Sequence, residues 1–148
     1  MKYKVLCFFL SFFYLGKVKY APGTLASVLT AFIWYRIDFS KNIQILIIIS
    51  IVIVGLFLCY LYSKYNEEKD PNFIVVDEVA GMSIALFMVP KVGHLFLLSF
   101  LLFRIFDIFK PGFISTSEKI ENGIGIMLDD IISGIMTLCL IHLLMNWI

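Results

Sequence analysis

Acidic residues in this chain gather at the ends of its apolar stretches. Asp129 and Asp130 precede a stretch that runs without charge to the C-terminus, Asp77 and Glu78 open an earlier one, and Asp107 ends a third. A carboxylate at the centre of a membrane helix costs roughly 2.5–3.5 kcal/mol, and less near the interface. Neighbouring carboxylates also repel each other unless a cation neutralises them or they share a proton. We therefore predict that these five acids form one metal site.

The type of ligand indicates which metal and which chemistry. Carboxylate oxygens favour Mg²⁺, Ca²⁺ or Mn²⁺ over zinc or copper, and Mg²⁺ commonly completes its shell with water and substrate phosphate. Arg104 lies three residues before Asp107, so the two share a helical face, and Lys110 follows one turn later. Arginine can bind phosphate through two hydrogen bonds and lysine supplies a point charge. A metal site beside fixed cations predicts phosphoryl chemistry on an anionic substrate. Taken alone, Arg104 and Asp107 could be no more than an ion pair at the membrane interface. Asp77 and Glu78 could likewise be solvated residues in the first turn of a helix, where the helix dipole favours acids.

Two glycine turns could bring backbone close to this site. Gly23 and Thr24 follow Pro22 at the expected start of a helix, where free N–H groups favour an anion. Gly123-Ile124-Gly125 could allow close approach to the metal or the substrate. Either turn could equally be only the entry to a helix.

Composition places the chain in a membrane. Of its 148 residues 61% are hydrophobic, well above the soluble average of about 45–50%. The length suggests one domain, residues 1–148. The net charge of +1 gives no electrostatic argument for nucleic acid. The three cysteines are isolated in apolar segments, which predicts a packing role.

The apolar runs are continuous rather than alternating, which favours helices over a barrel. We expect an all-α fold, a small multi-pass membrane bundle of about four to five apolar helices. The apolar stretch 5–15 is too short to cross a membrane, so we expect a re-entrant or interfacial N-terminal helix, although a membrane-spanning helix remains an alternative. Thr24 is the expected N-cap of the next helix, Asp70 and Pro71 are expected to start another, and Lys110-Pro111-Gly112 should end a third. The expected apolar segments are 24–35, 43–62, 73–89, 93–109 and 126–148.

Threading these segments back and forth gathers the acids on one side. The loops before residue 24 and over 63–72 and 110–125 share that side, whereas 36–42 and 90–93 lie opposite. Lysine and arginine are more frequent on the acidic side, which the positive-inside rule assigns to the cytoplasm. That side holds Lys17, Lys19, Lys64, Lys69, Arg104, Lys110 and Lys119, and the other holds Arg36, Lys41 and Lys91. His94 and His142 lie away from the acids in this arrangement.

Four motifs together resemble the phosphatidylglycerophosphatase A family. They are Ala21-Pro22-Gly23-Thr24, Asp77-Glu78-Val79-Ala80-Gly81-Met82, the run from Phe103 to Pro111, and the run from Gly123 to Asp130. The order and spacing match over most of the chain. Departures from the usual pattern are Asn122, Phe113 and Glu118, which bear on loop shape rather than on the acids.

The resemblance implies a Mg²⁺-dependent enzyme of the bacterial inner membrane, with its active site on the cytoplasmic face. It would hydrolyse the phospholipid phosphatidylglycerophosphate to phosphatidylglycerol and phosphate. The metal ligands carried over are Asp77, Glu78, Asp107, Asp129 and Asp130. The catalytic residues would be Asp129, Asp130, Asp107 and Arg104, and the phosphate-binding residues Arg104, Lys110, Gly23 and Thr24.

Several alternatives stay open at this point. The attacking group could be a water activated by the metal or an aspartate. The oligomeric state, the metal count and the range of lipid phosphates are not fixed by the sequence. A different class of protein, a small ion-coupled transporter or channel, could also use intramembrane acids to bind cations. Such a protein should carry ionisable groups deep within its helices, whereas here they stay near one surface.

Overall fold

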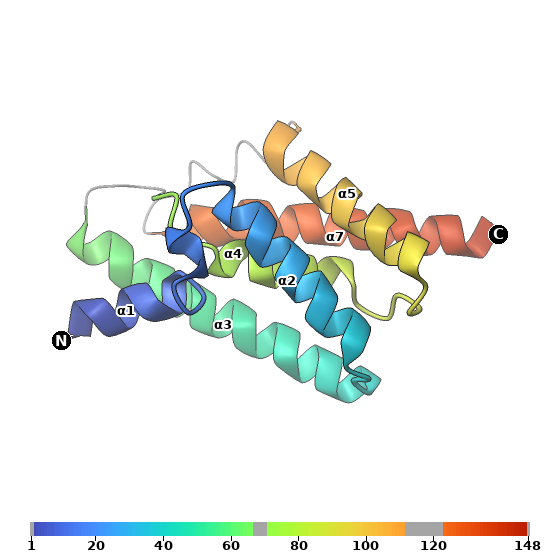
Figure 1. Cartoon of the computed structure of the whole chain (residues 1–148), viewed down its shortest axis with the longest axis horizontal. Helices are drawn as coiled ribbons and strands as arrows, with labels where there is room; N and C mark the ends of the chain where they lie inside the picture. The colour runs from blue at the N-terminus through green and yellow to red at the C-terminus, as the bar shows by residue number, and fades with distance from the viewer. Residues whose placement is uncertain (1, 67–70, 112–122, 148) are drawn as a thin grey trace.

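The computed structural model describes residues 2–66, 71–111 and 123–147 (Figure 1). Within these ranges the chain forms six α-helices and one 3₁₀ turn, and no strand, which confirms the expected all-α class. The elements are α1 (Lys2–Leu10), η1 (Leu15–Lys17), α2 (Pro22–Arg36), α3 (Lys41–Tyr65), α4 (Val76–Ala85), α5 (Gly93–Phe109) and α7 (Ile124–Trp147).

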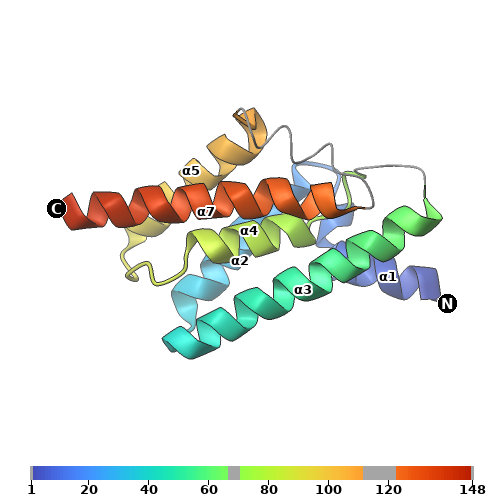
Figure 2. The same ribbon diagram turned by 180° about the vertical axis from the view of Figure 1, so that it is seen from behind.

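The short helix α4 is the centre of the molecule. Every residue of α4 except Glu78 is buried. In both views α4 lies among the other helices, with α7 directly beside it (Figures 1 and 2). Its apolar residues join two buried clusters, one around Ala80 with α3 and α7 and one around Met82 and Ala85 with α5 and α7. Burial on all sides explains why α4 is apolar around its whole circumference after the first turn, apart from Ser83, while Asp77 and Glu78 lie in that first turn.

Two of the described helices, α3 and α7, are long and apolar enough to cross a membrane. Only 17% of the apolar window of α3 is buried, so most of this helix offers apolar side chains such as Leu46, Ile53 and Phe57 to its surroundings. This pattern indicates association with a membrane, where such a face is solvated by lipid. Helices α2, α4 and α5 have 15, 10 and 17 residues. The full bundle of four to five membrane helices therefore stays a prediction.

Helix starts differ from the expected ones in three places. Helix α2 begins at Pro22 rather than after Thr24, because proline already has a helical φ and Ala21 takes the left-handed N-cap position. Helix α4 begins at Val76 rather than at Pro71, since the Val75 N–H donates to the Leu10 carbonyl (3.0 Å) and holds the preceding residues against α1. The expected cap Asp70 lies outside the described residues. Helix α7 begins at Ile124, which moves the Asp129–Asp130 pair from the mouth of the helix into its second turn.

The helix end expected at Lys110-Pro111-Gly112 is confirmed. Helix α5 ends at Phe109, and Lys110 follows in the left-handed region with φ 42°. The N-terminal helix α1 is also short, ending at Leu10, and three consecutive residues with positive φ (Phe12, Phe13 and Tyr14) then turn the chain toward η1. Its placement as an interfacial or re-entrant helix remains a prediction.

The described parts of the connections lie at two ends of the molecule, in the grouping that the threading predicted. At one end the Lys91 ammonium pairs with Asp38 (2.6 Å), and the Met88 N–H donates to the Gln44 side chain (3.0 Å). These contacts join the 36–42 connection to the 86–93 connection. At the other end the segments 16–24 and 71–74 and the end of α5 border one polar cavity. Lys69 and Lys119 lie outside the described residues.

Candidate metal and phosphate site

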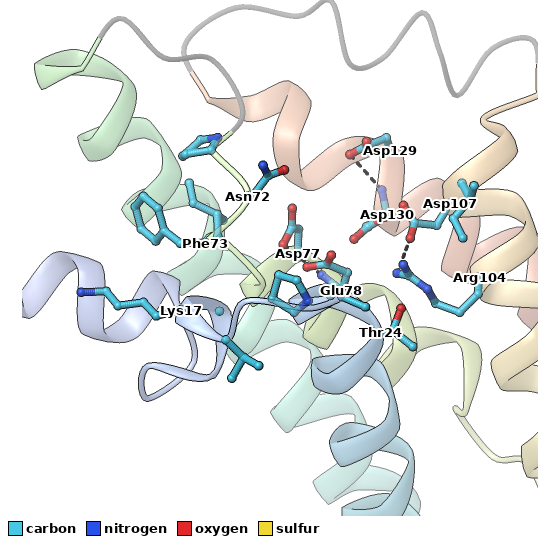
Figure 3. Close-up of a pocket in the computed structure, with 18 of the residues that line it drawn as sticks. Lys17, Thr24, Asn72, Phe73, Asp77, Glu78, Arg104, Asp107, Asp129 and Asp130 are labelled. Carbon is cyan, nitrogen blue, oxygen red and sulfur yellow. Dashed lines mark hydrogen bonds and ion pairs between the residues drawn. The ribbon is translucent and has the colours of Figure 1, made fainter.

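The polar cavity at this second end has a volume of about 910 Å³ (Figure 3). All nine residues predicted for the site line it: Gly23, Thr24, Asp77, Glu78, Arg104, Asp107, Lys110, Asp129 and Asp130. They come from α2, α4, the end of α5 and α7, so the cavity unites motifs separated by more than half the sequence. The prediction that these residues come together is confirmed, whereas their individual roles remain proposals.

A close crossing of α4 and α7 brings the acids together. A Cβ added to Gly81 would lie 2.5 Å from the Asp130 carbonyl oxygen, and one added to Gly134 would lie 2.4 Å from the Gly81 carbonyl oxygen. The absence of a side chain at both glycines lets the two backbones touch. Asp77 precedes Gly81 by four residues, and Asp130 precedes Gly134 by four. Asp130 therefore takes part in the crossing through its own carbonyl, Asp77 lies one turn before Gly81 on α4, and both acids line the cavity.

Asp77, Glu78 and Asp130 form the most compact group of acids. One carboxylate oxygen from each lies within 4.8 Å of the others. The side chains of Asp77 and Asp130 are only 8% and 3% exposed. Glu78 Oε2 and Asp130 Oδ1 are buried without a hydrogen-bond partner. Buried carboxylate oxygens are costly when unpaired, so this trio fits a divalent cation that would accept their lone pairs.

The electrostatic state of Asp77 and Glu78 agrees with that fit. Both lie outside the two long apolar helices. Burial raises the pKa of Asp77 well above its ordinary value, and the negative charges of Glu78 and Asp130 add to the effect. Burial also raises the pKa of Glu78, although the hydrogen bond with Asp77 acts in the opposite direction. Neutralising the pair requires protons or a cation.

The other two acids are ion-paired with the predicted phosphate-binding cations. Arg104 forms a short ion pair with Asp107 within α5. Lys110 Nζ lies 2.7 Å from Asp129 Oδ2 and so links the end of α5 to α7. Arg104 Nε is buried without a hydrogen-bond partner, which leaves the guanidinium a donor to offer. The five predicted ligands thus divide into an unpaired trio and two acids that hold cations in place.

Gly23 has a more specific surrounding than the sequence indicated. A Cβ added to Gly23 would lie 1.8 Å from Glu78 Oε1. The glycine thereby leaves space for the Glu78 carboxylate at the start of α2, next to Thr24 on the cavity wall (Figure 3). The first turn of a helix carries partial positive charge and suits a carboxylate as well as a phosphate.

Gly123 makes its close approach elsewhere. It has φ +73°, and a Cβ added there would lie 2.3 Å from the Cys59 carbonyl oxygen of α3. Its lack of a side chain therefore permits contact between the start of α7 and α3, not approach to the cavity. The family departures Asn122, Phe113 and Glu118 lie outside the described residues.

Sequence reasoning did not assign several other residues that line the cavity. Lys17 and Lys19 were used only as topology signals, and Asn72 and Phe73 were read as loop and apolar residues. The signal that could have identified the lysines is their position within a short segment between glycines, Gly16 and Gly23, on the acidic side. Neither histidine lines the cavity, as expected. His142 Nδ1 contacts the Leu138 carbonyl oxygen of its own helix (3.0 Å).

Comparison with known proteins agrees with this arrangement of residues. The chain is 32% identical over 136 residues to the phosphatidylglycerophosphatase A of Haemophilus influenzae, covering 89% of this chain and 83% of the relative. It is 33% identical over 134 residues, 85% of this chain and 84% of the relative, to a protein of Bacteroides thetaiotaomicron provisionally named phosphatidylinositol-3-phosphatase. No solved structure matches the chain significantly. The family model described as phosphatidylglycerophosphatase A matches residues 8–145. The chain therefore belongs to the phosphatidylglycerophosphatase A family of lipid phosphatases.

Proposed function

We propose that this protein hydrolyses phosphatidylglycerophosphate to phosphatidylglycerol and phosphate in a Mg²⁺-dependent reaction. The observation that carries the proposal is that one cavity holds the acidic trio, with Asp77 and Asp130 buried, beside the two ion-paired cations Arg104 and Lys110. The Haemophilus relative's name supports the glycerophosphate head group. The Bacteroides relative's name supports a phosphoinositide as the competing substrate.

The trio Asp77, Glu78 and Asp130 would hold the cation, because two of its buried oxygens have no other partner. Asp107 and Asp129 remain candidate ligands at the edge of the trio. When bound, Mg²⁺ supplies Lewis-acid stabilisation of the charge on the transferring phosphoryl group.

The residues of the chain itself would orient the phosphate and balance its charge. Arg104 would donate hydrogen bonds to the phosphoryl oxygens from its unpartnered Nε–H and its other guanidinium N–H groups. The ion pair with Asp107 would fix the orientation of the guanidinium. Lys110, held by Asp129, would add a second positive charge at the mouth of the cavity. A water, or the carboxylate of Asp129 or Asp130, would attack phosphorus. The bond from phosphorus to the glycerol oxygen then breaks, and that oxygen takes up a proton. If a carboxylate attacks, a water must then hydrolyse the aspartyl phosphate to release phosphate and restore the carboxylate.

The location of the reaction follows from the distribution of charge. We place the protein in the bacterial inner membrane as a multi-pass protein, with the cavity on the cytoplasmic face. Positive side chains surround the cavity end, including Lys17, Lys19 and Lys110, and the apolar face of α3 is available to lipid.

The test is phosphate release by the purified protein in detergent, with phosphatidylglycerophosphate and phosphatidylinositol 3-phosphate as parallel substrates. We expect release from the first lipid that requires Mg²⁺ and stops with EDTA. Asp130→Asn should lower kcat on the order of 100-fold or more. Asp38→Asn is the matched control, because that aspartate pairs with Lys91 at the opposite end.

Two outcomes would contradict the proposal. Faster release from the phosphoinositide would assign the protein to that substrate. Absent release, or release insensitive to EDTA, would favour the cation transporter instead.

A further inference from the structure

We propose that the groove between α2 and α5 binds one acyl chain of the lipid substrate. This inference rests on the proposed function, because it assumes that the substrate is a lipid phosphate. The groove is a hollow of about 340 Å³ with an almost entirely apolar lining. Helix α2 contributes Val28, Phe32 and Tyr35, and α5 contributes Gly93, Leu97 and Phe100.

The groove starts where the phosphate site ends. Thr24 and Arg104 line the polar cavity. Val28 follows Thr24 by one turn of α2, and Phe100 precedes Arg104 by one turn of α5, so the groove continues the cavity along both helices. The two helices lie side by side in both views (Figures 1 and 2). In a lipid whose terminal phosphate contacts Arg104, the glycerol and the phosphodiester would cover the first turn beyond the cavity, and the acyl chain would meet the apolar surface farther along the groove.

The groove has room for a flexible chain, a packed inner wall and an open far end. Val28, Phe32 and Leu97 are 48%, 58% and 59% exposed. The rings of Tyr35 and Phe96 pack edge to face, with centroids 5.2 Å apart, and close its inner wall. A Cβ added to Gly93 meets nothing within 4 Å, so the far end is open. The path along α2 from Thr24 to Tyr35 is about 16 Å, at 1.5 Å per residue.

Continuity with the polar cavity favours the substrate's own chain over other occupants. The apolar face of α3 is also exposed, and bulk lipid in the membrane accounts for it. The α2–α5 groove differs because the phosphate-binding cations lie beside it, Arg104 on α5 and Lys110 directly after α5. A second hollow of about 240 Å³ is lined by residues of α1, the turn after it, α3 and α4, including Val54 and Val79. It contains no residue of α2 or α5 and so provides a control.

The test compares homologous phosphatidylglycerophosphate substrates with acyl chains from about four to about eight carbons, presented as monomers below micelle formation. Each methylene that enters the groove should raise kcat/KM about four-fold in the wild type. Val28→Trp should fill the groove and remove at least about ten-fold from kcat/KM for the longest chain, while kcat for the shortest chain stays within about two-fold. Gly93→Leu, placed in open space, should affect only chains long enough to reach it.

The matched control is Val54→Trp, which fills the other hollow and should keep the wild-type dependence on chain length. The inference is overturned if wild-type kcat/KM does not depend on chain length, or if Val28→Trp and Gly93→Leu leave that dependence unchanged. It is also overturned if Val28→Trp dissociates an oligomer seen by light scattering, since the groove would then be an interface between copies. Failure of the wild type to release phosphate from any chain length would instead contradict the proposed function.

Discussion

At the scale of single residues, charge compensation separates the five acids into two kinds. Asp107 and Asp129 each have a cation of the chain within ion-pair distance. Among the described residues, Asp77, Glu78 and Asp130 have no cation within ion-pair distance, and Glu78 Oε2 and Asp130 Oδ1 have no hydrogen-bond partner. An uncompensated buried charge destabilises a fold by several kcal/mol, so the trio is the part of the site that a bound cation would stabilise most.

Gly23→Ala should weaken the binding of Mg²⁺ although it adds only a methyl group. The new Cβ would overlap Glu78 Oε1 and must displace that carboxylate. We expect Mg²⁺ affinity to fall about 10–100-fold, as when groups that orient a metal ligand are removed. The measurement is the rise in the thermal unfolding midpoint during a Mg²⁺ titration. The double variant Gly23→Ala/Glu78→Asp, with a shorter carboxylate, should recover part of the affinity. An unchanged titration for Gly23→Ala would show that Glu78 is not a ligand.

The raised pKa values of Asp77 and Glu78 predict how stability depends on pH. Their values in the unfolded chain are near 3.8 and 4.5, and the folded values are higher. Between the unfolded and folded values the native state binds more protons, so stability falls as pH rises, by up to about 1.4 kcal/mol per pH unit and group.

In EDTA, the unfolding midpoint should therefore fall as the pH is raised from about 5 to about 8. Mg²⁺ should reduce this fall, because it pairs with the charges as they form. Asp77→Asn should flatten the curve in EDTA. A midpoint in EDTA that rises over the same range would contradict the burial of these carboxylates in the folded state.

At the scale of helices, the crossing of α4 and α7 determines the geometry of the trio. Gly134→Val should push α7 away from the Gly81 carbonyl and destabilise the protein by about 1–3 kcal/mol. Because the Asp130 backbone is part of the crossing, the Mg²⁺-induced rise in the midpoint should shrink as well. Gly93→Ala is the matched control, since its Cβ has open space. If Gly134→Val kept the full response to Mg²⁺, the crossing would not be what positions Asp130.

The helices also show what the sequence could predict. Continuous apolar runs and the Lys110-Pro111 break located the helices, and the threading placed the five acids on one side of the bundle. The structure adds that these acids line one cavity with Gly23, Thr24, Arg104 and Lys110. Predictions from local sequence, such as helix starts, were wrong where a contact with a distant segment sets the backbone conformation. Pro71 does not start α4, because Val75 hydrogen-bonds to Leu10 far back in the chain. The contact between Glu78 and Gly23 depends on how α2 and α4 cross. The division of the acids into a trio and two ion-paired residues likewise depends on how the helices pack. Residue spacing along a single helix does not specify either arrangement.

At the scale of the whole molecule, the two ends differ in chemistry. The cavity end holds the acids, Arg104 and several lysines, whereas the described part of the opposite end has the Lys91–Asp38 pair and short connections. Between them run the apolar faces of α3 and the α2–α5 groove. This difference between the two ends suits an enzyme that binds a charged head group at one surface of a bilayer while the acyl chains of the lipid stay beside its helices.

The orientation of the molecule can be tested with single cysteines. In a background with Cys7, Cys59 and Cys139 replaced by alanine, Lys19→Cys reports on the cavity end and Asn42→Cys on the opposite end, and both positions are exposed. If the positive-inside rule holds, a membrane-impermeant thiol reagent should label Asn42→Cys in intact spheroplasts and Lys19→Cys only after permeabilisation. The cysteine-free protein controls for background labelling, and retained phosphatase activity confirms folding. Labelling of Lys19→Cys but not Asn42→Cys from outside would place the cavity on the external face. The lipid phosphate would then have to reach the site from that side, because burial of its charge within the bilayer is strongly unfavourable.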